Sequence, residues 1–428
     1  MDIARKIAVQ ALEKCEKSGY SNLILNHSLE TSSLSQRDKG FVSILVYGTV
    51  ERMYYLNYIL QKFVTKPLAK LVILQSALYQ CLFLDTVPNS AAINEAVTLT
   101  RAMGKTSAAG FVNAVLRKAA AVKTEDLTFK NEIKKTSVLY SVSESLAKFF
   151  IDNFPLECKE ILSATLTKPK TVICVNTLKT TEENLVTALT KNGAVLEKED
   201  IQNAYAVQYK GDITKTDEFK NGHFYVQGLP SQIAALTLGA KAGDKVIDVC
   251  SAPGGKAATV ARCMQNKGEI ICCDLQENRL SLIESLLKRV GITNAKVMQW
   301  DATVFNKAFE NADAVLCDVP CSGIGIMAKK PDIRHKNVDD LSTLIDTQKA
   351  ILKVSSQYVK VGGHLVYSTC TINKNENENV VNDFLISNKN FALKNIDILK
   401  KECAEMVTFL PQKEQSDGFF VAYLERLC

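Results

Sequence analysis

Apolar residues in the first part of the chain recur three and four positions apart, which is the spacing of one buried helix face. The first members of this pattern are Ala4, Ile7, Ala8, Ala11, Leu12 and Cys15. Ser35 stands three residues before Asp38 and ahead of an apolar run, a combination that marks a helix start. The same spacing predicts helices at about 68–83, 90–103 and 107–120. We therefore expect residues 1–122 to form an all-helical domain.

A polar stretch at Lys123–Asp126 then interrupts the helical pattern and has the composition of a linker. Residues 135–240 mix short helical segments with runs of β-branched and aromatic residues. The clearest runs are Thr171–Val175 and Ala204–Val207, and both are predicted to be strands. This region is interpreted as a small α+β domain over residues 135–240.

The pattern changes to a regular alternation of apolar runs and helical segments over residues 241–428. Strands are predicted at Lys245–Val249, Glu269–Cys273, Lys296–Trp300, Ala314–Cys317 and His364–Ser368, with helices at 257–264, 276–290 and 340–359. Strands that alternate with helices favour a Rossmann-like α/β domain with a parallel sheet covered on both faces. The last apolar run, Gly418–Leu424, is predicted to be a strand that closes one edge of this sheet.

Length, composition and charge narrow the class of protein only slightly. A chain of 428 residues is long enough for two or three domains, and 46% hydrophobic with 23% charged residues is typical of a folded protein. The formal net charge is +6 and the pI is about 8.5. This mild basicity permits a nucleic-acid partner and does not require one.

The numbers of cysteines and histidines indicate whether a metal site is expected, and the cysteines also bear on the cell compartment in which the protein is expected. The 13 cysteines include no Cys-x-x-Cys pair and there are only four histidines, so no metal site is expected. The stretch Met1–Lys6 lacks the apolar segment of a signal peptide, and no run of about 18 apolar residues predicts a membrane span. Thiols without an export signal are typical of the reducing cytoplasm, where we expect this protein.

A glycine-rich turn follows the first predicted strand of the α/β domain, at Asp248–Lys256. Its sequence is neither a dinucleotide-binding Gly-x-Gly-x-x-Gly motif nor a Walker A motif, because Ala257 follows the lysine. Asp274 and Asp301 end the next two strands, where acids can accept hydrogen bonds from a nucleoside. One nucleoside without phosphates fits S-adenosylmethionine. The alternative is an ordinary turn with solvated acids at the strand ends.

Two cysteines lie where predicted strands run into loops. Cys321 belongs to Asp318-Val319-Pro320-Cys321-Ser322, and Cys370 belongs to Tyr367-Ser368-Thr369-Cys370-Thr371. Two thiols beyond a cofactor turn suggest that sulfur attacks the substrate covalently and that the bond is later undone. A disulfide between these two cysteines is an alternative that a reducing compartment disfavours. The other cysteines considered are interpreted as small buried hydrophobes, namely Cys81, Cys272, Cys273 and Cys317.

Together these motifs resemble the RNA cytosine-5 methyltransferases, and over the full length the chain is similar to the RsmB type. The matching motifs are Asp248–Lys256, Asp318–Cys321 with Lys330-Pro331-Asp332-Ile333, and Thr369-Cys370 with Asn375-Glu376-Asn377-Glu378. Residues 1–122 resemble a NusB-type helical RNA-binding domain through Ile93–Val97 and Phe111–Arg117. This helical domain distinguishes the RsmB type from relatives that methylate tRNA or other RNA.

The resemblance implies methyl transfer from S-adenosylmethionine to carbon 5 of a cytosine in small-subunit (16S) ribosomal RNA. It implies that Cys370 attacks carbon 6, that Cys321 assists proton removal and release, and that Asp318 protonates or hydrogen-bonds N3. The implied cofactor-binding residues are Cys250, Ser251, Ala252, Pro253, Gly254, Gly255, Lys256, Asp274, Arg279, Asp301 and Asp318. A monomer without a bound metal is expected.

Other functions remain open at this point. The same chemistry on tRNA is one alternative, and a non-catalytic RNA-binding or antitermination factor with a relic methyltransferase domain is another. A basic segment follows the Cys321 loop and is predicted to contact RNA phosphates or to be a solvated loop. It consists of Lys329, Lys330, Arg334, His335 and Lys336.

Overall fold

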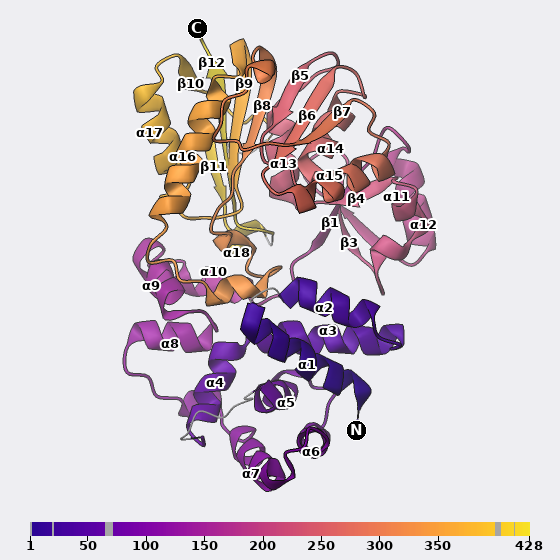
Figure 1. Ribbon diagram of the computed structural model, residues 1–428, viewed down its shortest axis with the longest axis vertical. Coiled ribbons are helices and arrows are strands. Elements are labelled where there is room, and N and C mark those ends of the chain that lie inside the picture. The colour runs from indigo at the N-terminus through magenta and orange to yellow at the C-terminus, as the bar shows by residue number, and fades with distance from the viewer. Residues whose placement is uncertain (1, 19–20, 65–71, 399–403, 415) are drawn as a thin grey trace. The chain divides into compact units, whose positions relative to one another are not determined.

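The computed structural model describes residues 2–18, 21–64, 72–398, 404–414 and 416–428 (Figure 1). The chain forms two compact units. The helical unit contains residues 1–166 and 327–340, and the sheet unit contains residues 167–326 and 341–428. The division into domains at 1–122, 135–240 and 241–428 stays a prediction, because compactness alone does not show which segments fold independently.

The helical unit is built from ten helices in the part of it that the structure describes. They are α1 (Ile3–Ser18), α2 (Ser21–Glu30), α3 (Gln36–Glu51), α4 (Met53–Gln61), α5 (Val72–Phe83), α6 (Asn89–Ala102), α7 (Ala109–Ala119), α8 (Glu132–Leu139), α9 (Glu144–Asn153) and α10 (Cys158–Ala164). The predicted start of α3 is confirmed, because Ser35 Oγ accepts a hydrogen bond from Asp38 N at 3.2 Å. Residues 68–71 of the predicted helix 68–83 lie outside the described residues.

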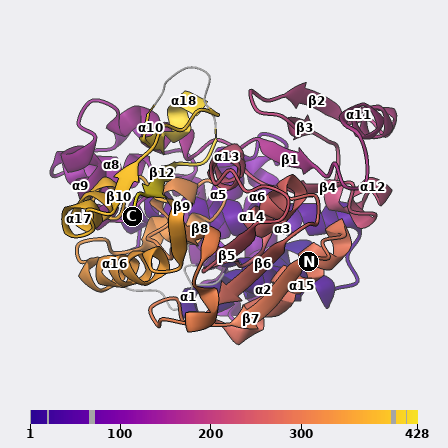
Figure 2. The ribbon, with the colours of Figure 1, turned by 90° about the horizontal axis from the view of Figure 1, so that it is seen from above.

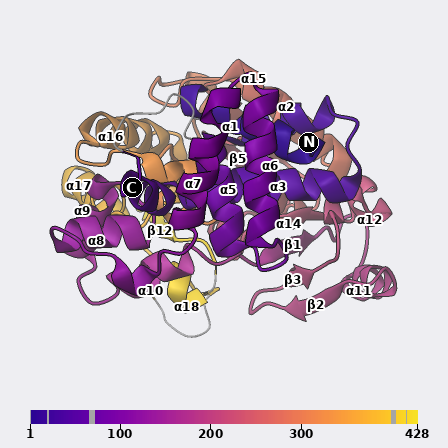
Figure 3. The same ribbon diagram turned by 90° about the horizontal axis from the view of Figure 1, so that it is seen from below.

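Apolar packing holds these helices in two clusters. One cluster joins α1 and α3 through residues such as Leu12 and Val46, and the other joins α4 to α7 through residues such as Leu56, Leu78 and Leu116. Figure 3 shows α5, α6 and α7 side by side. The helical spacing of apolar residues therefore predicted the right class of structure for this part of the chain.

A short segment from the second half of the chain completes the helical unit. Within residues 327–340, Arg334 is fully buried and donates hydrogen bonds to the Tyr140 carbonyl at 3.0 Å and the Thr165 carbonyl at 2.5 Å. His335 lies 3.1 Å from the Val50 carbonyl oxygen and stacks on Tyr54. The prediction that Arg334 contacts RNA phosphates is therefore wrong, because its buried side chain holds the segment inside the unit. For the partly exposed His335 the contact stays a prediction.

The sheet unit contains a small antiparallel sheet with the strand order β2-β3-β1-β4. Its elements are β1 (Thr171–Val175), α11 (Glu182–Lys191), β2 (Val195–Lys198), β3 (Ala204–Gln208), α12 (Asp217–Lys220) and β4 (Phe224–Val226). The strands predicted at 171–175 and 204–207 are confirmed. The sequence did not predict β2 and β4, because β2 is largely exposed and β4 is only three residues long.

The larger sheet has the order β10-β12-β9-β8-β5-β6-β7, which can be followed in Figure 2. Its strands are β5 (Lys245–Asp248), β6 (Glu269–Asp274), β7 (Ala295–Gln299), β8 (Ala312–Asp318), β9 (Val359–Thr369), β10 (Phe391–Leu393), β11 (Met406–Phe409) and β12 (Phe419–Arg426). Neighbours from β9 to β7 are parallel, as expected. The predicted edge position of the last strand is wrong, because β12 lies between β9 and β10 and also pairs with β11.

Helices cover both faces of this sheet (Figure 1). One face packs against α13 (Leu229–Thr237), α14 (Gly255–Cys263) and α15 (Glu277–Val290), and the other against α16 (Ser342–Ser356) and α17 (Glu378–Ser387). The remaining short helices are α18 (Pro411–Glu414) and the 3₁₀ turns at Thr106–Ala108, Thr124–Asp126, Ile213–Lys215, Lys307–Phe309, Ile324–Ile326 and Pro331–His335. The double covering accounts for the continuously apolar strands of the sequence.

Successive strand residues alternate between the two cores. Cys272 packs into the core under α14, and its neighbour Cys273 packs into the core under α16. Both of these cysteines and Cys317 are fully buried, which confirms their interpretation as small hydrophobes, whereas Cys81 is only half-buried. Among the described residues, no helix is both long and apolar enough to cross a membrane.

Candidate active site

Four aspartates gather at the carboxyl ends of neighbouring parallel strands. Asp248, Asp274 and Asp318 are the last residues of β5, β6 and β8, and Asp301 follows β7 by two residues. The pairing registers place these strand ends along one edge of the sheet. Ligands of doubly wound α/β folds bind outside this edge. The acids that the sequence indicated are therefore brought to one place.

The turn after β5 is folded tightly against the neighbouring strand. Ser251 N donates to the Cys273 carbonyl at 2.7 Å, and Gly254 N donates to the Ser251 carbonyl at 2.7 Å. Gly254 has φ of 101°, and a Cβ on it would lie 3.2 Å from the Cα of Ile283. Glycine is required at this position because side chains rarely adopt that backbone conformation. The helix α14 begins directly after it, with its first N–H groups at the turn.

Asp274 and Arg279 hold the turn from the next strand. Asp274 is buried, and one of its carboxylate oxygens accepts from Ala252 N at 3.2 Å. Arg279 forms an ion pair with Asp274 at 3.3 Å and donates to the Ala252 carbonyl at 2.9 Å. Asp301 lies further along and accepts from both Thr303 N and Thr303 Oγ1, at 2.9 and 2.7 Å. Arg279 therefore contacts the turn itself in this structure.

The turn also contains buried polar groups that lack protein partners. Both carboxylate oxygens of Asp248 and the hydroxyl of Ser251 have no hydrogen-bond partner among the described residues. Burial raises the pKa of Asp248 to about 7. Buried polar atoms without partners indicate a missing ligand or water. Four carboxylates at this edge disfavour a phosphate and suit the ribose hydroxyls and positive sulfonium of S-adenosylmethionine, so the residues present fit this cofactor.

Lys256 and Asp318 connect the cofactor turn, Asp248–Lys256, with the loop after β8 that contains Cys321. We call this loop the first cysteine loop and the loop after β9 that contains Cys370 the second. Lys256 Nζ lies 2.6 Å from one carboxylate oxygen of Asp318, and Ser368 Oγ donates to the other oxygen at 2.8 Å. The lysine also lies over the Phe419 ring at 5.2 Å. Both partners of the ion pair are largely buried, with side-chain exposures of 12% and 26%. Asp318 is therefore oriented from two sides.

The two thiols singled out in the sequence are neighbours in the structure. Cys321 follows β8 and Cys370 follows β9, and their sulfur atoms are 3.2 Å apart. No disulfide joins them. The pKa of Cys321 is raised well above its ordinary value, first by its hydrogen bond with Cys370 and then by burial. The Cys321 thiol is therefore protonated near neutral pH.

A buried polar cluster behind the thiols was not predicted to act in the site. Glu376 accepts hydrogen bonds from Ser322 in the first cysteine loop and from Thr371 in the second. Gln348 on α16 also donates to Glu376. Only the resemblance of the Asn375–Glu378 stretch pointed to this part of the chain, and no local signal indicated Gln348.

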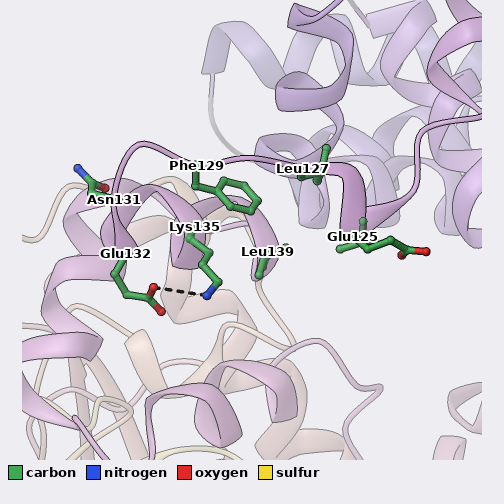
Figure 4. Close-up of a pocket in the computed structure, with 8 residues that line it drawn as sticks. Glu125, Leu127, Phe129, Asn131, Glu132, Lys135 and Leu139 are labelled. Carbon is green, nitrogen blue, oxygen red and sulfur yellow. Dashed lines mark ion pairs between the residues drawn. The ribbon is translucent and has the colours of Figure 1, made fainter.

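Within the described residues, three hollows are lined by residues of the helical unit alone. The first, of about 790 Å³, is lined by Thr124, Glu125, Leu127, Phe129, Asn131, Glu132, Lys135 and Leu139. In Figure 4 the ion pair between Glu132 and Lys135 lies across it, at 3.5 Å. Its charges are mixed, and we assign it no function.

The other two hollows adjoin each other along α6 and α7, with volumes of about 390 and 410 Å³. Asn94 and Arg117 line both of them, and Arg101 lines the second. None of the residues described along either hollow carries a carboxylate. We call this pair of hollows the α6–α7 groove.

The doubly wound sheet, the acidic edge and the cofactor turn define the class of S-adenosylmethionine-dependent methyltransferases. The family model of the 16S rRNA methyltransferase RsmB/F matches residues 235–425, and that of the NusB family matches residues 2–121. A Bacillus subtilis protein named probable ribosomal RNA small subunit methyltransferase B is 34% identical over 99% of this chain and 98% of its own length. The chain belongs to the RsmB/F family of methyltransferases, with a NusB domain at its N-terminus. The resemblance and fold class predicted from the sequence are confirmed.

Two further comparisons cover different shares of the chain. A tRNA (cytosine(72)-C(5))-methyltransferase from Pyrococcus horikoshii is 34% identical over 50% of this chain and 55% of its own length. The crystal structure of the protein PH0851 covers 99% of this chain and 98% of its own chain, with a TM-score of 0.84 and 23% identity. That second likeness shows the fold alone.

Proposed function

We propose that this protein transfers a methyl group from S-adenosylmethionine to carbon 5 of a cytosine in small-subunit ribosomal RNA, through a covalent bond between Cys370 and carbon 6. The observation that supports this most directly is the pair of sulfur atoms 3.2 Å apart at the strand ends, next to the acidic edge. The full-length relative named as a small-subunit ribosomal RNA methyltransferase supports the RNA class.

The chemistry explains why a thiol is needed. Carbon 5 of cytosine is a poor nucleophile. When the Cys370 thiolate adds to carbon 6, electron density moves to carbon 5 and the ring gains a proton or hydrogen bond at N3. Carbon 5 can then take the methyl group that S-adenosylmethionine supplies when bound. Loss of the carbon 5 proton finally expels the thiolate. Covalent catalysis thus divides one difficult step into easier ones.

The geometry supports different roles for the two thiols. The raised pKa of Cys321 keeps its thiol protonated, so it can donate a hydrogen bond to the Cys370 sulfur, 3.2 Å away, when Cys370 acts as a thiolate. Once the Cys370 sulfur is bonded to carbon, it no longer carries the negative charge that raises the pKa of Cys321. The pKa of Cys321 then falls, so its thiol can release its own proton to solvent, and the resulting thiolate can accept the carbon 5 proton when that proton must leave.

Asp318 is placed to interact with the ring as charge develops on it. Its carboxylate is oriented by Lys256 and Ser368, so little reorganisation is needed when a substrate binds. Asp274 and Asp301 would hold the ribose hydroxyls and the turn at 250–256 would hold the rest of the cofactor, with Arg279 fixing the turn.

The helical unit is proposed to select the RNA. The comparison with a tRNA methyltransferase covers only half of this chain, whereas the relative named for ribosomal RNA covers the NusB domain as well. We further propose that the protein acts as a monomer in the cytoplasm. The complete pair of oriented thiols with Asp318 disfavours the alternative of a non-catalytic RNA-binding factor.

A methyl-acceptor assay tests the proposed function. Purified protein with labelled S-adenosylmethionine is expected to modify 16S ribosomal RNA at a single cytosine and to leave tRNA unmodified. Bisulfite sequencing of the product identifies the base. If tRNA is labelled in preference to ribosomal RNA, tRNA is the substrate. If neither RNA is labelled although the protein binds the cofactor, the non-catalytic alternative is favoured.

The α6–α7 groove provides a prediction about RNA binding. Arg101 and Arg117 are exposed side chains in a groove without carboxylates, as expected for a surface that contacts phosphates. The double variant Arg101→Ala/Arg117→Ala is expected to weaken RNA binding. The slope of log affinity against log salt concentration should become shallower by about 1–2, because each phosphate contact contributes about 0.7–0.9 to it.

The matched control for this prediction is Lys105→Ala/Lys118→Ala, which removes the same charge from the neighbourhood of α6 and α7 without touching the groove lining. Equal losses in the two double variants would show that general basicity, and not the groove, accounts for the binding.

A further inference from the structure

We propose that Glu376 is a positioning residue that holds the two cysteine loops in register, so that attack and release take place on the same cytosine. This inference rests on the proposed roles of Cys370 and Cys321. It goes beyond them because it assigns the relative placement of the thiols to a third, buried side chain. Glu376 lies six residues after Cys370 and is fully buried.

Glu376 accepts two hydrogen bonds from the first cysteine loop, at the residue that follows Cys321. One carboxylate oxygen accepts from Ser322 N at 2.7 Å, and the other accepts from Ser322 Oγ at 2.6 Å. The backbone and the side chain of one residue are thus fixed by the same carboxylate. Because Ser322 is the neighbour of Cys321, its restraint limits where the Cys321 sulfur can move.

The same carboxylate reaches the second loop. Its Oε1 atom accepts from Asn373 Nδ2 at 3.1 Å and, more weakly, from Thr371 Oγ1 at 3.4 Å. Ser322 Oγ and Thr371 Oγ1 are themselves 2.9 Å apart, so the residues next to the two thiols contact each other beside Glu376. These contacts join segments that are about fifty residues apart in the sequence.

Two further bonds fix the carboxylate and its backbone. Gln348 Nε2 donates to Glu376 at 3.1 Å and to the Pro320 carbonyl at 2.9 Å, so the first loop is held on both sides of Cys321. Tyr367 in β9 donates its hydroxyl proton to the Glu376 carbonyl at 2.7 Å. Glu376 therefore connects α16, β9 and both cysteine loops.

A buried carboxylate is costly unless its oxygens are satisfied, and an apolar residue is often as stable in such a place. Among the described residues no ion pair involves Glu376, and its partners are neutral donors of the surrounding loops and α16. Charge-assisted bonds to neutral donors are short and directional. A carboxylate at this position thus imposes geometry on the two loops that an apolar side chain of similar volume could not impose.

The test uses Glu376→Gln, which keeps the shape and replaces one acceptor oxygen by a donor. At least one of the donors from Ser322 and Gln348 then faces an NH₂ group. The control is Glu378→Gln, the same change two residues on, where the side chain accepts a single bond from Thr408. Single-turnover methyl transfer is expected to fall about 10²-fold or more in Glu376→Gln. The Kd values for cofactor and RNA should change less than about threefold, and Glu378→Gln should match the wild type.

A second measurement reports thiol placement without methyl transfer. The oxidant diamide converts two adjacent thiols to a disulfide and takes up their two hydrogens. The rate of the Cys321–Cys370 cross-link, followed by mass spectrometry, is expected to fall in Glu376→Gln and to recover partly in Glu376→Asp, which retains a carboxylate. Should Glu376→Gln not fold, Gln348→Ala and Asn373→Ala each remove one hydrogen bond to the Glu376 carboxylate and are expected to lower the same rate.

The outcomes separate this proposal from the proposed function. An inactive wild type whose cross-linking slows in Glu376→Gln would contradict the function and support the positioning role. Unchanged single-turnover and cross-linking rates in a folded Glu376→Gln would overturn the positioning role. A lower melting temperature with unchanged rates would show that Glu376 only stabilises the fold.

Discussion

The Cys370→Ala variant loses methyl transfer by at least about 10³-fold, because removal of a covalent nucleophile takes away a step that no neighbouring group replaces. Cys321 does not substitute for it, because burial still raises the pKa of its thiol when Cys370 is absent. The affinity for S-adenosylmethionine stays within about twofold of the wild type, because the turn at 250–256 and Asp274 are unchanged. The measurements are single-turnover transfer of labelled methyl groups and calorimetric cofactor binding.

The control for this variant is Cys81→Ala, which removes a half-buried thiol from the helical unit. It is expected to retain transfer at the wild-type rate. Turnover retained by Cys370→Ala would overturn the assignment of the nucleophile, whereas a parallel loss of cofactor binding would show that the substitution disturbs the fold of the strand ends.

The Cys321→Ala variant should accumulate a protein–RNA adduct that survives denaturation. Attack by Cys370 does not require the second thiol, but removal of the carbon 5 proton does, so the bond between sulfur and carbon 6 persists. We expect a slow-migrating band in a denaturing gel with substrate RNA and cofactor, and a steady-state rate lowered by at least about 10²-fold.

The double variant Cys321→Ala/Cys370→Ala is the control, because without the nucleophile no adduct can form. An equally abundant adduct in the double variant would place the covalent bond on another residue. Rapid turnover by Cys321→Ala without an adduct would show that another base removes the proton.

Local patterns predicted the parts of this structure whose formation depends on neighbours in the sequence. The apolar runs of β5 to β9 and the helices between them are of this kind, since each is fixed by periodicity and by the burial of both sheet faces. The turn at 248–256 was also predicted, because two glycines and a lysine between a strand and a helix are typical of a ligand-binding turn. Short or exposed strands such as β2 and β4 carry no comparable signal.

The contacts that the sequence could not predict join residues far apart in the chain. Arg334 meets the Tyr140 carbonyl across 194 positions, and Ser322 meets Glu376 across 54. From the sequence, Arg334 is one cation of a basic segment, and only its complete burial reveals that it holds the segment in place. In the same way, Cys321 and Cys370 could be named from their motifs, but their separation follows from the pairing of β8 with β9.

The site of covalent attachment distinguishes the roles proposed for the two neighbouring thiols. The adduct formed by Cys321→Ala can be digested with nuclease and protease, and tandem mass spectrometry can locate the nucleotide on the peptide. If Cys370 is the nucleophile and Cys321 the release residue, a methylated cytidine is expected on the sulfur of Cys370. A nucleotide attached to any other residue, or a peptide containing unmodified Cys370 in the purified adduct, would contradict these roles.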